Sequence, residues 1–229
     1  MKTIGIIGGM SWKSSLDYYR MINEIVKDKL GGWNSAKIIM YSVNFAEIDL
    51  EHRGKNWERS DNMLIDAAKK LEQAGADFII IGANTAHTLY DKIQANIQIP
   101  IIHIADATAE KIRAKNIKIV GLLGTKHTMN QDFYKGRLEN KYGIKVIVPN
   151  EEEKEIVHKE INNIILGNLG SDAKKQYVEI INNLAKNGAE AVILGCTEIP
   201  LIISQEDVRV LLFDTAKIHA ETAVEYALK

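Results

Sequence analysis

Two stretches of this chain, 113 residues apart, are near copies of each other. Residues 75–85 read Gly-Ala-Asp-Phe-Ile-Ile-Ile-Gly-Ala-Asn-Thr, and residues 188–198 read Gly-Ala-Glu-Ala-Val-Ile-Leu-Gly-Cys-Thr-Glu. In each copy an apolar run ends in glycine and leads into polar residues, which is the pattern of a buried strand that opens onto a loop. Because ligands bind at the carboxyl ends of strands in open parallel sheets, the repeat predicts two equivalent strand ends that are candidate ligand sites.

The repeat extends along the chain. Ile4–Gly8 matches Val120–Gly124 at an offset of 116, and Ile102–Asp106 matches Val210–Asp214 at an offset of 108. Apolar strands that end in glycine also resemble one another by chance, but three matches in the same order favour a duplicated α/β half in this chain. Between the matches, strand patterns alternate with helical ones, including one predicted helix over 129–142, and such alternation is typical of parallel sheets.

The sequence therefore predicts an α/β fold with two pseudo-symmetric Rossmann-like domains, each a doubly wound parallel sheet. We place the first domain at residues 1–98 plus 214–229 and the second at residues 99–213. If a pseudo-twofold axis relates the domains, their equivalent strand ends face each other, which predicts an active site in the cleft between them. Residues 83 and 196 would then approach one ligand from opposite sides.

Composition narrows the possible functions. Of the 229 residues, 46% are hydrophobic and 26% are charged, and the net charge of −1 gives no basic field for nucleic acid or a membrane surface. No apolar run is long enough to span a membrane. A single cysteine rules out an intrachain disulfide and fits a reducing compartment, so we predict a cytoplasmic protein. Six separated histidines without an H-x-x-x-H spacing predict no metal site.

The two copies differ at the position that decides their chemistry. Cys196 stands in one copy, whereas Ala83 occupies the matching position in the other. A lone cysteine at a strand end is commonly a small core residue. Two cysteines on opposite sides of an amino acid would instead form a two-base device, in which one thiolate removes the Cα proton and the other thiol returns a proton to the opposite face. We expect loop amides and a following helix N-terminus to lower the pKa of such a thiol.

Neutral donors are also expected near these strand ends, because the carbanion-like intermediate needs hydrogen bonds around its carboxylate. Four side chains follow strand ends and could supply them: Asn84, Thr85, Thr125 and Thr197.

Several segments, taken together, resemble the aspartate/glutamate racemase family. They are Gly8-Gly9-Met10-Ser11-Trp12, Asn84-Thr85-Ala86-His87, Ile104–Thr108, Leu123-Gly124-Thr125, Gln131–Leu138 and Gly195-Cys196-Thr197-Glu198-Ile199. No single segment is a strong motif, but their order and spacing cover essentially the whole chain. The resemblance implies a racemase that works without pyridoxal phosphate or metal. It is closest to the broad aspartate/glutamate branch, in which the first catalytic position is not always cysteine.

The resemblance also implies roles for individual residues. Cys196 matches the second catalytic cysteine, and Ala83 stands where the first would be. Arg53, with His52, lies in a loop that resembles the family's reader of the distal carboxylate, and a guanidinium can bind a carboxylate bidentately. The positions that match the holders of the α-carboxylate are Asn84, Thr85, Thr125 and Thr197, and Met10 matches a pocket-lining position.

Two further residues near these segments are open to different interpretations. Glu198 either polarises the site or caps a helix. His87 is predicted to be a capping or structural histidine, with a role as a base as the alternative.

Alanine at position 83 can neither remove nor return a proton. It is either an engineered substitution that stops turnover or a natural residue that leaves a one-thiol enzyme, in which Cys196 alone exchanges the Cα proton of one enantiomer. The main prediction is cofactor-independent racemisation of aspartate or glutamate with impaired two-base turnover.

Two alternatives stay open. Maleate isomerases and arylmalonate decarboxylases resemble this architecture, so the chain could be a single-cysteine isomerase or decarboxylase of dicarboxylic acids. It could also be a non-catalytic protein that binds an acidic amino acid. In each case we predict a small-molecule ligand and no cofactor, and the frequency of twofold dimers among oligomers predicts a homodimer.

Overall fold

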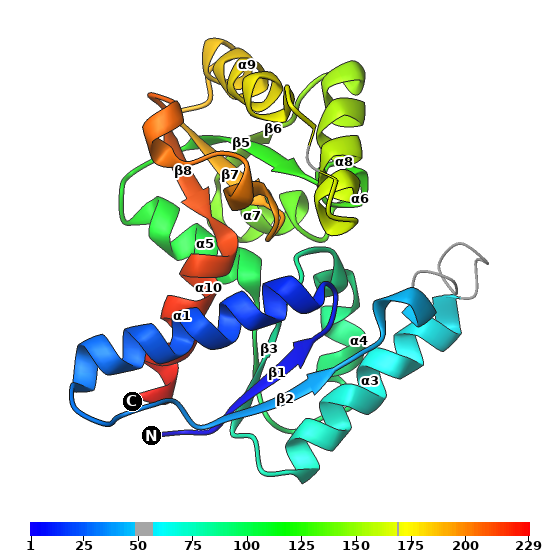
Figure 1. The fold of residues 1–229 in the computed structure, drawn as a ribbon, viewed down its shortest axis with the longest axis vertical. Coiled ribbons are helices and arrows are strands. Elements are labelled where there is room, and N and C mark those ends of the chain that lie inside the picture. The colour runs from blue at the N-terminus through cyan, green and yellow to red at the C-terminus, as the bar shows by residue number, and fades with distance from the viewer. Residues whose placement is uncertain (49–56, 169) are drawn as a thin grey trace. The chain divides into compact units, whose positions relative to one another are not determined.

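The computed structural model describes residues 1–48, 57–168 and 170–229. The chain forms two compact units (Figure 1). Unit 1 contains Met1–Ile104 together with His219–Lys229, and unit 2 contains Ala105–Ile218.

The unit boundaries fall inside two helices. These are α5 (Ile104–Arg113) and α10 (Thr215–Ala227). The sequence places the boundaries a few residues earlier, at 98/99 and 213/214. A helix that continues from one unit into the next leaves no polar linker that a sequence pattern could detect.

Unit 1 is built on a parallel sheet with the strand order β2-β1-β3-β4. Its central strands β1 and β3 are entirely buried, as expected of parallel strands whose two faces are covered. Phe78 of β3 packs edge-on against Tyr226 of α10, with 4.8 Å between ring centroids, so the C-terminal helix completes this unit. Besides the end of α10, the elements of unit 1 are β1 (Ile4–Gly8), α1 (Trp12–Leu30), β2 (Ile38–Ser42), α3 (Trp57–Gln73), β3 (Phe78–Ile81), the 3₁₀ helix η1 (Thr85–Leu89), α4 (Tyr90–Gln94) and β4 (Ile101–Ile102).

Unit 2 repeats this architecture with the strand order β6-β5-β7-β8. Its core joins Leu123 and Val192 of the sheet to Val157 and Tyr177 of two covering helices. Besides α5 and the start of α10, its elements are β5 (Ile119–Gly124), α6 (Lys126–Asn130), α7 (Lys135–Tyr142), β6 (Lys145–Ile147), α8 (Glu151–Ile165), α9 (Ala173–Lys186), β7 (Ala191–Gly195), the 3₁₀ helices η2 (Ile199–Leu201) and η3 (Gln205–Asp207), and β8 (Leu211–Asp214).

The two sheets share their strand register as well as their strand order. In unit 1, Ile4 pairs with Phe78. The sequence offsets of 116 and 113 carry these two residues to Val120 and Ala191, which are partners in unit 2. The first two repeat matches are therefore confirmed in three dimensions.

The third repeat match is wrong by three residues. Ile102 pairs with Ile80, and the residue that pairs with the counterpart of Ile80 in unit 2 is Phe213. The true offset is therefore 111 instead of 108. Strand β4 has only two residues, which are too few apolar positions to fix an alignment by sequence alone.

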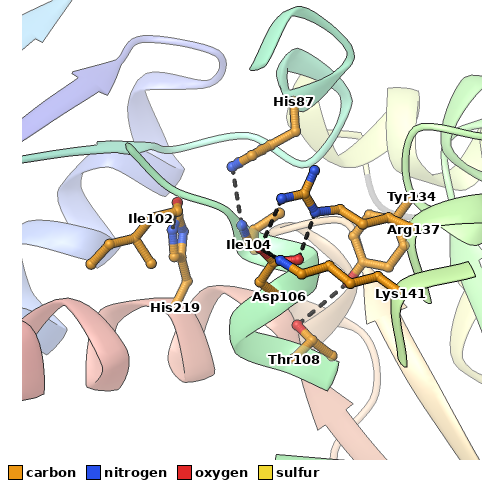
Figure 2. Close-up of polar contacts among 9 residues, drawn as sticks. All are labelled: His87, Ile102, Ile104, Asp106, Thr108, Tyr134, Arg137, Lys141 and His219. Carbon is orange, nitrogen blue, oxygen red and sulfur yellow. Dashed lines mark hydrogen bonds and ion pairs between the residues drawn. The ribbon is translucent and has the colours of Figure 1, made fainter. Parts of the chain in front are cut away.

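Helix ends follow local sequence signals in part. Ser11 caps α1, because its hydroxyl accepts a hydrogen bond from the Ser14 N–H, and Gly31 ends the helix with a φ of 67°. The single helix predicted over 129–142 is wrong, because the chain forms α6 and α7 with a break between them. Around the break Tyr134 is fully buried, and its hydroxyl donates to Thr108 Oγ1 at 3.4 Å (Figure 2).

Candidate active site

Four of the predicted site residues lie at the carboxyl edge of the unit 1 sheet. Met10 follows β1, and Ala83, Asn84 and Thr85 follow β3, which is the parallel neighbour of β1. Ala83 and Asn84 are buried, whereas Met10 and Thr85 are half-buried. Unit 1 therefore presents this part of the predicted site on two adjacent strand ends.

The turn after β1 is held close to the end of β2. Gly9 has a φ of 95°, and a Cβ atom added there would lie 2.1 Å from the Val43 carbonyl oxygen, so only glycine fits. The Gly9 N–H donates to Ser15 Oγ at 2.7 Å, and Ser15 Oγ in turn donates to the Ser11 carbonyl at 3.0 Å. These contacts place Met10, which packs against the core of unit 1. Ser15 has no separate signal in the sequence beyond its helical position.

The loop after β3 is held by His87. The ring is 1% exposed, and its Nδ1 atom lies 2.9 Å from the Ala83 carbonyl oxygen. Its Nε2 atom accepts a hydrogen bond from the Ile104 N–H at 3.2 Å. The structural role predicted for His87 is confirmed, although the sequence did not indicate its partners.

Unit 2 presents the cysteine at the matching place. Cys196 follows β7 directly, as Ala83 follows the Gly82 that ends the equivalent run in unit 1. Its thiol donates to Glu198 Oε2 at 3.2 Å, and Thr197 Oγ1 donates to the same oxygen at 2.7 Å. Of the two roles considered for Glu198, the contact with the thiol favours polarisation of the site.

The environment of Cys196 favours the protonated thiol. Burial raises the pKa of Cys196 well above its ordinary value, and the nearby Glu198 carboxylate raises it further, while backbone N–H groups of Glu198 and Thr197 act in the opposite direction. The expectation of a lowered thiol pKa is therefore wrong, because loop amides are outweighed by burial and a carboxylate.

Thr125 follows β5, the strand next to β7, but its hydroxyl already has local partners. Its Oγ1 accepts from the Thr128 N–H at 3.2 Å and lies 3.1 Å from Thr128 Oγ1, so Thr125 is the N-cap of α6. Gly124 pairs with Gly195 across the two strand ends, so Thr125 and Cys196 each follow one member of a backbone pair.

The other two predicted ligand contacts, His52 and Arg53, lie outside the described residues. Their predicted role as readers of a distal carboxylate stays a prediction.

Two segments that carry the family resemblance contact each other within unit 2. Asp106 accepts from Arg137 Nε and Nη2 at 2.6 and 2.8 Å, and from Lys141 Nζ at 2.8 Å (Figure 2). Burial alone would raise the pKa of Asp106, but the hydrogen bonds from Arg137 and Lys141 outweigh it and lower that pKa. The carboxylate therefore ties α5 to α7.

In residues 1–48, 57–168 and 170–229, no group of three or more His, Cys, Asp or Glu side chains is arranged to hold a metal ion. Over the same ranges, no helix has both the length and the apolar character needed to cross a membrane.

This chain is similar to known proteins in sequence and in fold. The sequence model of the Asp/Glu/hydantoin racemase family matches residues 7–223. By sequence, the chain is 25% identical to the broad specificity amino-acid racemase RacX of Bacillus subtilis, over 96% of each protein.

Two solved structures are similar to this chain over their full length. An Asp/Glu racemase candidate from Yersinia pestis has 45% identity and a TM-score of 0.94, and an aspartate racemase homologue from Pyrococcus horikoshii has 43% identity and a TM-score of 0.87. In both comparisons each chain is covered completely. The predicted fold class, two α/β units with parallel sheets, is confirmed.

Proposed function

The chain belongs to the Asp/Glu/hydantoin racemase family and is an amino-acid racemase, an isomerase, and from this premise we propose that Cys196 exchanges the Cα proton of an acidic amino acid. Aspartate and glutamate are the proposed substrates. The observation that carries the proposal is the hydrogen bond from the Cys196 thiol to the buried Glu198 carboxylate at a strand end.

In the proposed reaction Glu198 first accepts the thiol proton, which leaves a thiolate on Cys196. The thiolate then takes the Cα proton, and the electron pair of the broken C–H bond stays on the substrate, delocalised into its carboxylate. Hydrogen-bond donors that meet this developing charge lower the barrier. The proposed donors are Asn84, Thr85, Thr125 and Thr197, with Met10 lining the pocket and Arg53 or His52 binding the distal carboxylate.

Ala83 limits what this chemistry can achieve. Two-base racemisation needs a second group that delivers a proton to the opposite face of Cα, and the duplicate of Cys196 is an alanine. We therefore propose that Cys196 returns the proton to the face from which it came. Such a reaction exchanges the Cα hydrogen of one enantiomer with solvent and produces little of the other enantiomer.

A second candidate function is favoured by the raised pKa of Cys196. Decarboxylation of a malonate-type acid generates a carbanion without a base and then needs a proton donor. A thiol that stays protonated suits that step, and one thiol is enough. Malonates and maleate therefore belong in the same assay.

The proposal is tested by following solvent-deuterium exchange at Cα with proton NMR. L- and D-aspartate and L- and D-glutamate are incubated separately in D₂O with the unmodified chain and with Cys196→Ser. We expect exchange of one enantiomer only, and its loss in Cys196→Ser. Exchange that persists in Cys196→Ser contradicts the role of the thiol. If no Cα proton exchanges but an arylmalonate or maleate is converted, the second candidate function is favoured. If an acidic amino acid binds without any reaction, a sensor is favoured.

Three further properties accompany the proposal. We propose that the protein needs no pyridoxal phosphate or metal, that it acts in the cytoplasm and that it is a homodimer. Activity that persists after exhaustive dialysis against a chelator tests the independence from metal. The mass measured by light scattering tests the homodimer.

A further inference from the structure

A buried histidine connects the candidate site of unit 1 to the helix that follows its last strand. His87 Nδ1 contacts the carbonyl of Ala83, and His87 Nε2 contacts the N–H of Ile104, the first residue of α5. Figure 2 shows the His87 side chain directed at Ile104. One side chain thus joins the position equivalent to Cys196 to a helix start.

The partners of His87 permit one protonation state. A carbonyl oxygen only accepts a hydrogen bond, so Nδ1 carries a proton, and a backbone N–H only donates, so Nε2 carries a lone pair. An imidazolium ring has no lone pair to accept the Ile104 N–H. His87 is therefore the neutral Nδ1–H tautomer, and neither ring nitrogen is left to act as a base.

A second buried histidine nearby has the opposite tautomer. His219 Nε2 lies 2.8 Å from the Ile102 carbonyl oxygen, so it donates. His219 Nδ1 lies 3.0 Å from the Tyr18 hydroxyl and accepts from it, because burial lowers the pKa of His219 and keeps the ring neutral. The rings of His87 and His219 have their centroids 5.7 Å apart. Two histidines in fixed, opposite tautomers therefore hold the backbone around the ends of β3 and β4.

Unit 2 makes the corresponding connection with different chemistry. Thr215 is the counterpart of Ile104 at the offset of 111, and its buried hydroxyl donates directly to the carbonyl of Leu194 in β7 at 2.8 Å. The counterpart of His87 at the offset of 113 is Pro200, which has no side-chain hydrogen-bonding group. Both units thus tie the start of the helix after their fourth strand to the end of their third strand.

We infer that His87 is a positioning residue, which sets the conformation of the 83–85 loop by donating from Nδ1 to the Ala83 carbonyl. The inference deepens the proposed function and rests on it in one respect, since Asn84 and Thr85 of this loop are proposed holders of the substrate carboxylate. His87 itself does not touch the substrate. Its two hydrogen bonds can be separated by substitution.

His87→Asn and His87→Gln form the matched pair of variants. An asparagine amide nitrogen stands close to where Nδ1 was and can still donate to Ala83. A glutamine amide oxygen stands close to where Nε2 was and can accept from Ile104, but the Ala83 carbonyl loses its donor. Thr215→Val is the corresponding variant in unit 2, because valine has a similar shape and no hydroxyl.

The first readout does not depend on activity. Amide hydrogen exchange of the intact protein is measured by mass spectrometry on peptides that cover residues 82–90 and 194–200. We expect His87→Gln to accelerate exchange about tenfold in the first segment, because a buried carbonyl without a donor is costly, and His87→Asn to leave it nearly unchanged. Thr215→Val is expected to accelerate only the second segment. Equal acceleration by both His87 variants overturns the inference.

Two spectroscopic and kinetic readouts complete the test. Imidazole nitrogen NMR of the ¹⁵N-histidine protein should show a protonated Nδ1 for His87 and a protonated Nε2 for His219, with signals assigned by their loss in variants. An Nε2–H form of His87 overturns the inference. For the exchanging enantiomer of aspartate or glutamate, His87→Gln should raise KM about tenfold with a smaller change in kcat. Unchanged KM contradicts positioning. If the unmodified chain exchanges no Cα proton, the proposed function fails, and the first two readouts still decide on His87.

Discussion

Glu198 Oε2 lies 3.2 Å from Cys196 Sγ and accepts its hydrogen bond. Because a neighbouring negative charge favours the neutral thiol, Glu198→Gln is expected to lower the pKa of Cys196. The measurement is the pH dependence of thiolate absorbance, or of alkylation by iodoacetamide, and the signal is specific because the chain has one cysteine. Glu206→Gln, which changes an exposed carboxylate of the same unit, should leave the profile in place. A thiol pKa that rises in Glu198→Gln would contradict this account.

Ala83→Cys is expected to add racemisation to the exchange reaction. The new thiol would stand at the position equivalent to Cys196 and could deliver a proton to the other face of Cα, and general acid–base groups contribute rate factors of about 10² to 10⁴. Chiral chromatography of the product measures the appearance of the second enantiomer. Ala83→Ser adds an atom of similar size without an acidic thiol and serves as the control. A folded Ala83→Cys that exchanges but does not racemise would show that position 83 does not reach the substrate.

Acidification is expected to destabilise unit 1 through His219. Burial is the largest of the causes that lower the pKa of His219 from 6.5 to about 3. Below pH 6.5 the unfolded chain binds a proton that the folded chain does not, so stability falls by about 1.4 kcal/mol per pH unit until the folded pKa is reached. No such loss from His219 occurs above pH 6.5.

Urea unfolding at pH 7 and pH 5 tests the role of His219. His219→Gln removes the titrating ring, so its loss of stability between the two pH values should be smaller, even if it is less stable at pH 7. Tyr18→Phe removes the hydroxyl partner but keeps the buried ring, and should retain the steep pH dependence. Equal slopes for the unmodified chain and His219→Gln would rule out His219 as the source.

Arg137→Lys is expected to destabilise unit 2 by about 1–3 kcal/mol. The Arg137 and Asp106 side chains are only 22% and 23% exposed, and the guanidinium makes two parallel hydrogen bonds that a lysine ammonium does not reproduce. Arg20→Lys is the control, because Arg20 is 56% exposed in its pairs with Asp17 and Glu24, and exposed pairs contribute about 0–1 kcal/mol. Chemical unfolding measures the free energy of unfolding of both variants. Similar losses of stability in Arg137→Lys and Arg20→Lys would contradict this prediction.

Gly9→Ala is expected to cost much more stability than Gly143→Ala. Both glycines have positive φ, so both variants suffer a backbone strain of about 1–2 kcal/mol. Only the Cβ at position 9 would also meet the Val43 backbone, at 2.1 Å, whereas a Cβ at position 143 meets nothing within 4 Å. Thermal unfolding of the two variants isolates the steric contribution. Equal shifts in the unfolding temperature would mean that the turn after β1 can move away from β2.

The repeated strand ends were predictable because they depend on local pattern. Apolar runs that end in glycine predicted β3 and β7, and the offsets of 116 and 113 are reproduced by the observed register. The third offset failed where the strand is only two residues long. The helix over 129–142 failed because burial of Tyr134, a tertiary effect, interrupts a continuous helical pattern.

The candidate site was predictable in residue type but not in electrostatics. The position of Cys196 after a strand follows from the sequence, whereas the direction of its pKa shift depends on burial and on where the Glu198 carboxylate points. The hydrogen-bond partners of His87 were not predictable either, because Ile104 lies 17 residues away and no local sequence pattern connects the two residues.

Unit 1 is built from two separate segments of the chain, which has a consequence for folding during synthesis on the ribosome. Domains usually fold in the order in which they emerge, N-terminal first. Unit 1 contains the N-terminus but also needs residues 219–229, including His219 with its contacts to Tyr18 and Ile102, and Tyr226 against Phe78. Unit 2, whose residues are contiguous, can therefore complete its packing first, and the sheet of unit 1 keeps one flank uncovered until residues 219–229 have left the ribosome.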